Sequence, residues 1–344
     1  SNYNLTTGTF NISQKWVTVS GQRVYDATNT VNSSDLGVTG EVSGESISIT
    51  GTGSITDKNV GSGKTINTSG LSLANGTHSA SNYTIGTTSF AVTRRNVSIS
   101  GEKVYDGNGT VSSNQIDTVN TAGGETLNIG GQGSVSLPSV GTNKSITLGT
   151  LSISDGTSGT IGLASNYTLD SGLFDVTAKP ITLTGSRQYD GTTNVVSNDI
   201  TLVGEVTGES ITITGTGSVS DKNVGSGKTI NTTGLSLADD TSNASNYSLS
   251  SGTFSITQKS VNLSGTRQYD GTTTVSSGSI TLSGLIGSET LNKSGSVTIT
   301  SSNASTYSSG SINTSSLSLS DGSNGGLSSN YTLSGGSHSV SIDK

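Results

Sequence analysis

Residues 181–191 read ITLTGSRQYDG. In the first half of this stretch apolar and hydroxyl side chains alternate, so that Ile181 and Leu183 share one face of an extended chain and the threonines share the other. The stretch ends in Asp190-Gly191, two residue types that tolerate the positive φ of tight turns. These residues predict a half-buried strand that runs directly into a turn.

The Tyr-Asp pair of this stretch occurs four times, at intervals of 80, 84 and 80 residues. A glycine follows every copy but the first, where Ala27 takes its place. The pairs are Tyr25-Asp26, Tyr105-Asp106, Tyr189-Asp190 and Tyr269-Asp270. A basic residue two positions before each tyrosine shares its strand face; these residues are Arg23, Lys103, Arg187 and Arg267. Self-similarity at such a period predicts a tandem-repeat protein.

Two further markers keep the same period. Ser-Asn-Tyr recurs at intervals that alternate between 80 and 84 residues, with the tyrosines Tyr3, Tyr83, Tyr167, Tyr247 and Tyr331. Seven residues after each of these comes an aromatic or imidazole ring, namely Phe10, Phe90, Phe174, Phe254 and His338. A glutamate follows each Tyr-Asp tyrosine by 20 residues, as Glu45, Glu125, Glu209 and Glu289. Distances that stay fixed in every copy indicate a structural role rather than a compositional accident.

The markers divide the chain into four modules. Residues 15–95, 96–179, 180–259 and 260–344 are modules 1 to 4, and residues 1–14 match the tail of a preceding repeat, so we expect a longer array. Modules 1 and 3 are nearly identical over several stretches, which predicts a duplication unit of two modules. No Pro/Gly linker separates the strand expected near residues 90–92 from the one expected at 97–99, and short junctions favour a stiff rod.

The composition agrees with small β modules. Only 28% of the residues are hydrophobic and 4% aromatic, too few for one large shared core but enough for several small ones. No stretch shows a convincing 3.6-residue apolar period, and turn residues recur every 8 to 12 positions. The expected fold is all-β, with four tandem small β-sandwich (immunoglobulin-like) modules forming an elongated rod. A small β module that is not a sandwich is the alternative.

Composition also limits the function. The chain has no Cys and no Met, which is compatible with life outside the cell and leaves no thiolate for a metal or a nucleophile. Sixteen basic and 23 acidic residues give a net charge of −7, which argues against nucleic-acid binding. No apolar run approaches the roughly 20 residues that cross a bilayer, and no signal segment opens the chain, so we expect no membrane insertion and an export signal elsewhere.

The recurring Tyr-Asp residues have a structural and a functional interpretation. In the structural one, the tyrosine ring fills a small core with its hydroxyl hydrogen-bonded, the aspartate caps the following turn, and the recurring Arg and Glu form one ion pair per module. In the functional one, the four sites contact a ligand or an ion. The carboxylates are isolated and lack the dense ladder of calcium loops, so the structural interpretation is favoured and calcium stays an alternative.

Other motifs point to no catalytic chemistry. Residues 61–65 and 225–229 (GSGKT) resemble the tail of a phosphate-binding loop, but Lys58 and Lys222 stand where a glycine is required, and we expect the motif between strands. His78 and His338 occupy unrelated module positions, so neither a triad nor a zinc site is expected. Trp16, alone at its junction, is expected to pack there. The Ser-Asn-Tyr markers also create glycosylation sequons at Asn82, Asn166, Asn246 and Asn330.

The Tyr-Asp-Gly marker, the Ser-Asn-Tyr marker and their joint period resemble the YDG and MBG-type tandem repeats of large bacterial surface adhesins. Such repeats occur in filamentous-haemagglutinin-like and biofilm-matrix exoproteins. The resemblance covers essentially the whole chain and implies an exported, cell-associated fibre that holds an adhesive domain away from the cell. The chain departs from the pattern at Ala27 and at residues 301–304 (SSNA), which replace the DKNV of modules 1 and 3.

The sequence therefore predicts stalk or spacer repeats of an extracellular bacterial adhesin involved in attachment or biofilm, and not an enzyme. We expect no cofactor, a monomer, and neighbouring repeats of the same chain as the main partners. Through the full-length protein, glycans or matrix polysaccharide are further expected partners. Two alternatives remain: modules that themselves bind glycan or self-associate, and a calcium-stabilised rod.

Overall fold

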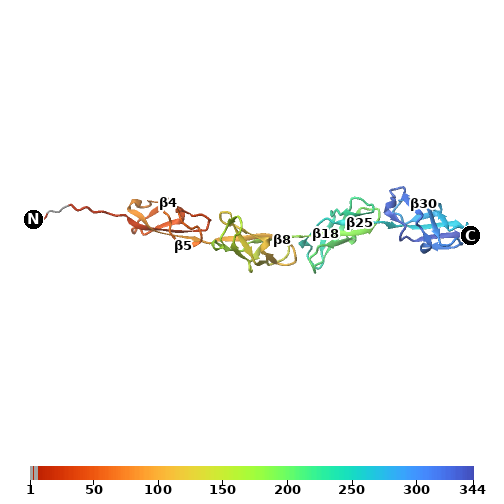
Figure 1. The fold of residues 1–344 in the computed structure, drawn as a ribbon, viewed down its shortest axis with the longest axis horizontal. Helices are drawn as coiled ribbons and strands as arrows, with labels where there is room; N and C mark the ends of the chain where they lie inside the picture. Colours follow the sequence, from red (N-terminus) through yellow and green to blue (C-terminus); the bar gives the residue numbers. More distant parts are fainter. Residues whose placement is uncertain (1–2, 4–6) are drawn as a thin grey trace. The chain divides into compact units, whose positions relative to one another are not determined.

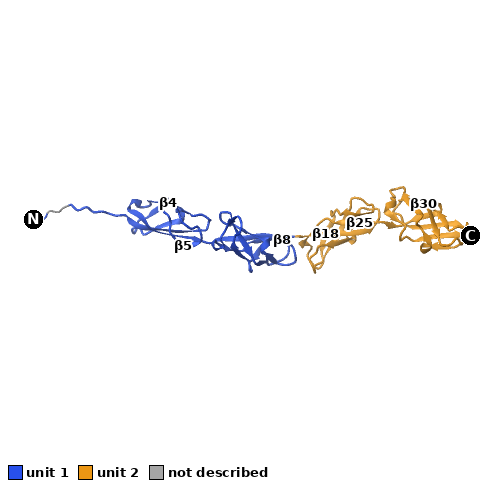
Figure 2. Cartoon of the chain, viewed as in Figure 1, with its two compact units in different colours: residues 1–177 blue, residues 178–344 orange. Residues whose placement is uncertain are grey.

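The computed structural model describes residues 3 and 7–344; parts of the predicted tail at residues 1–14, including the first Ser-Asn, lie outside the described residues. The chain is all-β, with short 3-10 turns, and divides into two compact units, Ser1–Thr177 and Ala178–Lys344 (Figure 2). Each unit holds one pair of the predicted modules. In the described part of the chain, no helix is long and apolar enough to cross a membrane.

Module 1 is a seven-stranded β-sandwich. Its strands are β1 (Lys15–Val24), β2 (Thr30–Asn32), β3 (Leu36–Thr39), β4 (Ile47–Ser54), β5 (Gly61–Lys64), β6 (Leu71–Asn75) and β7 (Tyr83–Thr93). One sheet has the order β3-β1-β7-β5 and the other the order β2-β4-β6. Val19 and Phe90 of the first sheet meet Val31, Ile49 and Leu71 of the second in one buried cluster. The two sheets thus enclose the small core that the alternating pattern predicts.

The other modules are also built from short strands (Figure 1), but in module 2 the pairing joins strands of both sheets into one seven-stranded sheet. Module 2 contains β8 (Arg95–Val104), β9 (Thr110–Ser112), β10 (Ile116–Val119), β11 (Glu125–Gly130), β12 (Gln132–Val135), β13 (Gly141–Thr147), β14 (Ser152–Asp155), β15 (Thr160–Ile161), β16 (Tyr167–Leu169) and β17 (Leu173–Thr177). Module 3 contains β18 (Lys179–Gln188), β19 (Asn194–Val196), β20 (Ile200–Val203), β21 (Ile211–Ser218), β22 (Gly225–Thr229), β23 (Leu235–Asp239), β24 (Tyr247–Leu249) and β25 (Thr253–Thr257).

Module 4 contains β26 (Lys259–Ser260), β27 (Asn262–Gln268), β28 (Thr274–Ser276), β29 (Ile280–Ser283), β30 (Leu291–Ile299), β31 (Thr306–Ser308), β32 (Ile312–Asn313), β33 (Leu317–Asp321), β34 (Tyr331–Thr332) and β35 (His338–Asp343). Single 3-10 turns connect the strands: η1 (Ser33–Asp35), η2 (Ala80–Asn82), η3 (Ser113–Gln115), η4 (Ala164–Asn166), η5 (Ser197–Asp199), η6 (Ala244–Asn246), η7 (Ser277–Ser279), η8 (Ser309–Ser311) and η9 (Ser328–Asn330). Four of these turns, η2, η4, η6 and η9, end at the asparagine of a Ser-Asn-Tyr marker.

The first and last strands of a module pair in parallel, which decides where the markers lie. In module 1, Lys15 is opposite Tyr83 and Val24 is opposite Thr93. Both strands therefore run from the end of the module that carries the Ser-Asn-Tyr tyrosine to the end that carries the Tyr-Asp pair. Only Arg94 separates β7 from β8, so the chain leaves at the far end of module 1 and enters module 2 there. Parallel pairs β8/β17, β18/β25 and β27/β35 repeat the arrangement.

One local expectation is wrong, and another stays open. The GSGK residues are not a loop between strands but form strands themselves, β5 in module 1 and the start of β22 in module 3, each at the edge of its sheet. The junction packing expected of Trp16 stays a prediction, because no strand precedes β1 among the described residues. The Trp16 side chain is 74% exposed and lies against Gly86 on β7, where the β1/β7 register shifts by one residue. A Cβ added to Gly86 would lie 3.1 Å from Cβ and Cε3 of Trp16, a tight contact that Trp16 would have to shift to accommodate.

Candidate functional site

In every module the Ser-Asn-Tyr tyrosine binds the recurring glutamate. The tyrosine hydroxyl donates to the carboxylate and accepts the backbone N–H of the residue three positions before the glutamate. The donor pairs are Tyr83 to Glu45, Tyr167 to Glu125 at 2.7 Å, Tyr247 to Glu209 at 2.6 Å and Tyr331 to Glu289 at 2.6 Å. The amide donors are Val42, Ala122, Val206 and Ile286, at 3.0 to 3.2 Å. This contact closes the N-terminal end of the module and explains why both markers keep one period.

The Tyr-Asp tyrosine of module 1 reaches the same glutamate in module 2. Tyr25 donates to Oε1 of Glu125 at 2.7 Å, and Lys58 donates to that oxygen at 2.8 Å. The rings of Tyr25 and Tyr167 pack edge to face with centroids 5.4 Å apart. Glu125 is 3% exposed, and its carboxylate therefore receives two tyrosines and a lysine in a dry environment. We call this contact between paired modules the joint.

The Ser-Asn-Tyr asparagine forms the second half of the joint. Asn166 is 1% exposed, accepts the backbone N–H of Val60 at 2.9 Å and donates to Oδ1 of Asn59 at 2.8 Å. Asp57 shapes this docking loop, because it accepts the N–H of Asn59 at 3.0 Å and pairs with Lys64 at 2.9 Å. The lysine of the GSGK stretch thus holds the loop that docks, and it has no phosphate-loop geometry.

Modules 3 and 4 form the same joint. Tyr189 and Lys222 donate to Oε1 of Glu289 at 2.7 and 3.0 Å, and the rings of Tyr189 and Tyr331 pack edge to face at 5.4 Å. Val224 donates its N–H to Asn330 at 2.9 Å, and Asn330 donates to Asn223 at 3.0 Å. Two copies of one contact set, in separate units, show that the joint is a property of the repeat.

The electrostatics of the joint follow from burial and these donors. Burial alone would raise the pKa of Glu125, but the hydrogen bonds from Lys58, Tyr167 and Tyr25 together hold it below its ordinary value. The pKa of Lys58 is raised, chiefly by its bond to Glu125. Burial, followed by the bonds to Glu125, raises the pKa of Tyr25 and of Tyr167. The closed joint therefore holds an ionised glutamate, a charged lysine and two neutral phenols. The same directions hold for Glu289 and Lys222.

The Tyr-Asp aspartates act locally. Each caps its turn by accepting the N–H two residues on, in the pairs Asp26–Thr28, Asp106–Asn108, Asp190–Thr192 and Asp270–Thr272. The expected Arg–Glu ion pair is wrong, because the basic residue pairs with this aspartate three positions away: Arg23–Asp26, Lys103–Asp106, Arg187–Asp190 and Arg267–Asp270. The basic side chain lies between the strand and the turn, where it also reaches turn carbonyls, such as that of Thr192 at 2.7 Å from Arg187.

The Tyr-Asp tyrosines have different surroundings. Tyr25 and Tyr189 are each 1% exposed and bound in a joint, and Tyr105 is also buried. Tyr269 is 56% exposed. The expectation that each ring fills the core of its own module is therefore correct only in part. Tyr25 belongs to a buried cluster that continues into module 2 through Val97, Ala122 and Tyr167.

The two histidines have different surroundings, and Nε2 of His78 lies 4.0 Å from Glu45. His78 contacts Thr77 at 3.0 Å and His338 contacts the carbonyl of Leu333 at 2.9 Å. Among the residues that the structure describes, no group of three or more His, Cys, Asp or Glu side chains is placed to hold a metal ion.

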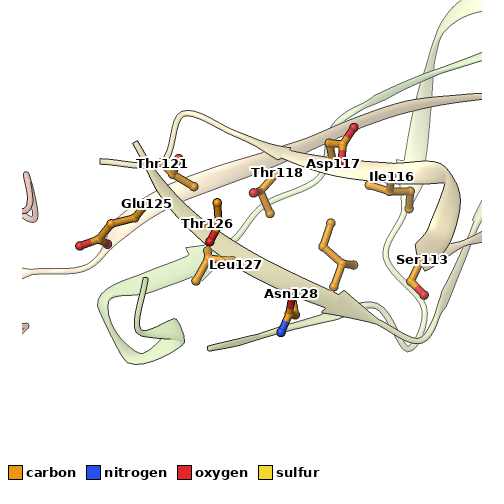
Figure 3. Close-up of a pocket in the computed structure, with 10 residues that line it drawn as sticks. Ser113, Ile116, Asp117, Thr118, Thr121, Glu125, Thr126, Leu127 and Asn128 are labelled. Atoms are coloured by element: carbon orange, nitrogen blue, oxygen red, sulfur yellow. The ribbon is translucent and has the colours of Figure 1, made fainter. Parts of the chain in front are cut away.

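A pocket of about 390 Å³ lies beside the first joint (Figure 3). Ile116, Thr118, Leu127 and Asn128 line it, and Glu125 lies at its edge with the carboxylate pointing away from Asn128. The glutamate therefore serves the joint and does not face into the pocket.

Sequence reasoning missed Lys58, Asn59 and their counterparts Lys222 and Asn223 as joint residues. The signal was present, since DKNV occurs only in the first module of each pair. Module 2 has LPSV at residues 137–140, and module 4 has SSNA at residues 301–304.

These contacts define a tandem-repeat β protein whose modules dock in pairs. The chain belongs to the YDG domain family, which matches residues 6–90, 92–172 and 175–254. No curated protein matches the chain.

Proposed function

We propose that this chain forms stalk or spacer repeats of a secreted or cell-surface bacterial adhesin, with a role in attachment or biofilm. The observation that carries the proposal is the joint, in which Glu125 of one module is buried against Tyr25 and Lys58 of another. A spacer has to transmit position and force from module to module, and a buried contact between modules does so better than a flexible linker.

The recurring polar residues support a mechanical role. The Tyr-Asp aspartates and their basic partners hold turns, and the Ser-Asn-Tyr tyrosines and recurring glutamates close module ends. In modules 1 and 3 the DKNV residues are engaged in docking the next module. We therefore propose a protein without catalytic activity or a cofactor. Its main partners are neighbouring repeats of the same chain, and its location is outside the cell.

Solution scattering from the full chain tests the proposal. An extended particle with the length of about four modules supports a spacer, and a compact globule overturns it. The same sample, applied to a glycan array and to sedimentation velocity, tests the alternative. Glycan binding or concentration-dependent association by these modules would replace the spacer with a binding array.

A further inference from the structure

Each joint contains a small space between its two modules, and the side chain that fills this space comes from a different module in each joint. In the second joint, the residue after the Tyr-Asp pair is Gly191, and the residue three positions before the glutamate is Ile286. A Cβ added to Gly191 would lie 2.7 Å from Cγ2 of Ile286, which is closer than such atoms approach. The isoleucine methyl of module 4 therefore occupies the place that a side chain on the module 3 turn would need.

In the first joint both residues are alanine. Ala27 replaces the glycine of the turn, and Ala122 replaces the isoleucine. Ala27 has a φ of 64°, a backbone conformation that favours glycine, so the methyl is kept there at a conformational cost. That methyl lies against module 2, because a Cβ added to Gly123 would lie 2.9 Å from it. Ala122 is buried in the cluster against which Ala27 packs.

The glycine equivalent to Gly123 in the second joint has different surroundings. Gly287 is the counterpart of Gly123, and a Cβ added to it would have no atom within 4 Å. Without a methyl on Gly191, the module 3 turn stands clear of this glycine, and the isoleucine supplies the volume instead. In the first joint the space is therefore filled by the methyl of Ala27 on the turn, and in the second by Ile286 on the facing module.

We propose that these two positions form a size code that selects which module ends dock together. We call the residue after the Tyr-Asp pair the turn position, and the residue three positions before the glutamate of the next module the face position. Ala at the turn fits Ala at the face, as in modules 1 and 2, and Gly at the turn fits Ile at the face, as in modules 3 and 4. With Ala at the turn and Ile at the face the two side chains overlap, and with Gly at the turn and Ala at the face a void remains between them. Both mismatches weaken a joint whose polar contacts are otherwise the same. The code supplies selectivity between near-identical modules, which the shared Tyr-Lys-Glu contacts do not.

A double-mutant cycle in the full chain tests the code. The variants are Gly191→Ala, Ile286→Ala and both together, and the readout is amide hydrogen exchange at Val224, whose N–H donates across the joint. Val60 in the other joint is the control within the same molecule. Peptides that begin at Ile55 and at Val219 separate the two otherwise identical DKNV stretches by mass.

Gly191→Ala is expected to raise exchange at Val224 about tenfold or more with Ile286 in place, and several-fold less in the Ile286→Ala background. Val60 keeps its exchange rate. Because the φ of Gly191 is 77°, an alanine there is strained in both backgrounds, and the difference between backgrounds isolates the contact with Ile286. An equal effect of Gly191→Ala in both backgrounds overturns the code.

The reciprocal cycle uses the first joint and guards against a variant that does not fold. Ala122→Ile is expected to raise exchange at Val60 about tenfold, and Ala27→Gly in addition is expected to restore most of the protection. If Ala27→Gly restores no more protection of Val60 in the Ala122→Ile chain than it adds in the parent chain, the code is also overturned. Neither result depends on whether the chain serves as a spacer.

Discussion

The hydroxyl of Tyr25 donates to Oε1 of Glu125 at 2.7 Å, across the joint between modules 1 and 2. Tyr189 and Glu289 repeat the contact at the same distance in the second pair. In both cases one marker of a module meets a different marker of the next module, 100 positions further along the chain. The repeat period is therefore maintained by contacts between modules as well as within them.

Removal of the Tyr25 hydroxyl weakens the first joint. In Tyr25→Phe, Glu125 loses one of its donors, and a hydrogen bond to a charged group contributes about 1.5–3 kcal/mol. Exchange at the Val60 amide is expected to rise accordingly. Tyr269→Phe is the matched control, because Tyr269 holds the same repeat position but is largely exposed, and it should leave Val60 unchanged. Equal effects of the two variants would contradict the role given to Tyr25.

Acid opens the joints. The pKa of Glu125 is lower in the closed joint than its ordinary value of 4.5, so closing favours the carboxylate. This contribution is fully present above pH 4.5 and is lost as the pH falls through the lowered pKa. Protection at Val60, corrected for the intrinsic exchange rate, should therefore decrease below pH 4.5. In Glu125→Gln this acid step should vanish at Val60 and persist at Val224; its persistence at both sites would refute the assignment.

Base opens the joints by the opposite route. Burial and the glutamate raise the pKa of Tyr25 above its ordinary value of 10. The neutral phenol contributes its full stabilisation below pH 10, and this is lost as the pH rises through the raised value. Tyrosine absorbance should show a titration step above pH 10 that disappears in Tyr25→Phe. Titration of Tyr25 at or below pH 10 would contradict a buried phenol.

The docking asparagine contributes through its amide. Asn166→Ala removes the acceptor of the Val60 N–H and the donor to Asn59, and an unsatisfied buried group costs about 1–3 kcal/mol. The first joint should open measurably in exchange experiments. Asn82→Ala changes the same marker where the side chain is exposed, and little effect is expected there. Comparable loss of protection at Val60 from both substitutions would argue against the docking role.

Periodicity predicted much of this fold. Alternating apolar residues such as Ile181 and Leu183 lie in a strand and are buried, and Asp190 caps its turn as expected. The spacing of Tyr25 and Glu45 located both markers of module 1 but not their partners. Partners follow from which module ends meet, and that depends on the parallel pairing of β1 and β7, which no local pattern reports.

The wrong predictions have the same origin. Arg23 and Glu45 belong to one module and keep one spacing, which suggested an ion pair, yet Arg23 lies at the C-terminal end and Glu45 at the N-terminal end. Residues 61–64 resemble the tail of a phosphate-binding loop, but they form an edge strand because Gly61 and Lys64 pair with Val92 and Phe90 of β7. Tertiary context decided both cases.

Amide hydrogen exchange of the unmodified full chain tests the central claim most directly. Val60 and Val224 donate their N–H groups across the two joints. If the joints are closed in solution, both amides should exchange far more slowly than in an unstructured peptide, and more slowly than exposed amides of the same modules. Exchange of both at the unstructured rate, with the strands of each module still protected, would show that the modules fold but do not dock.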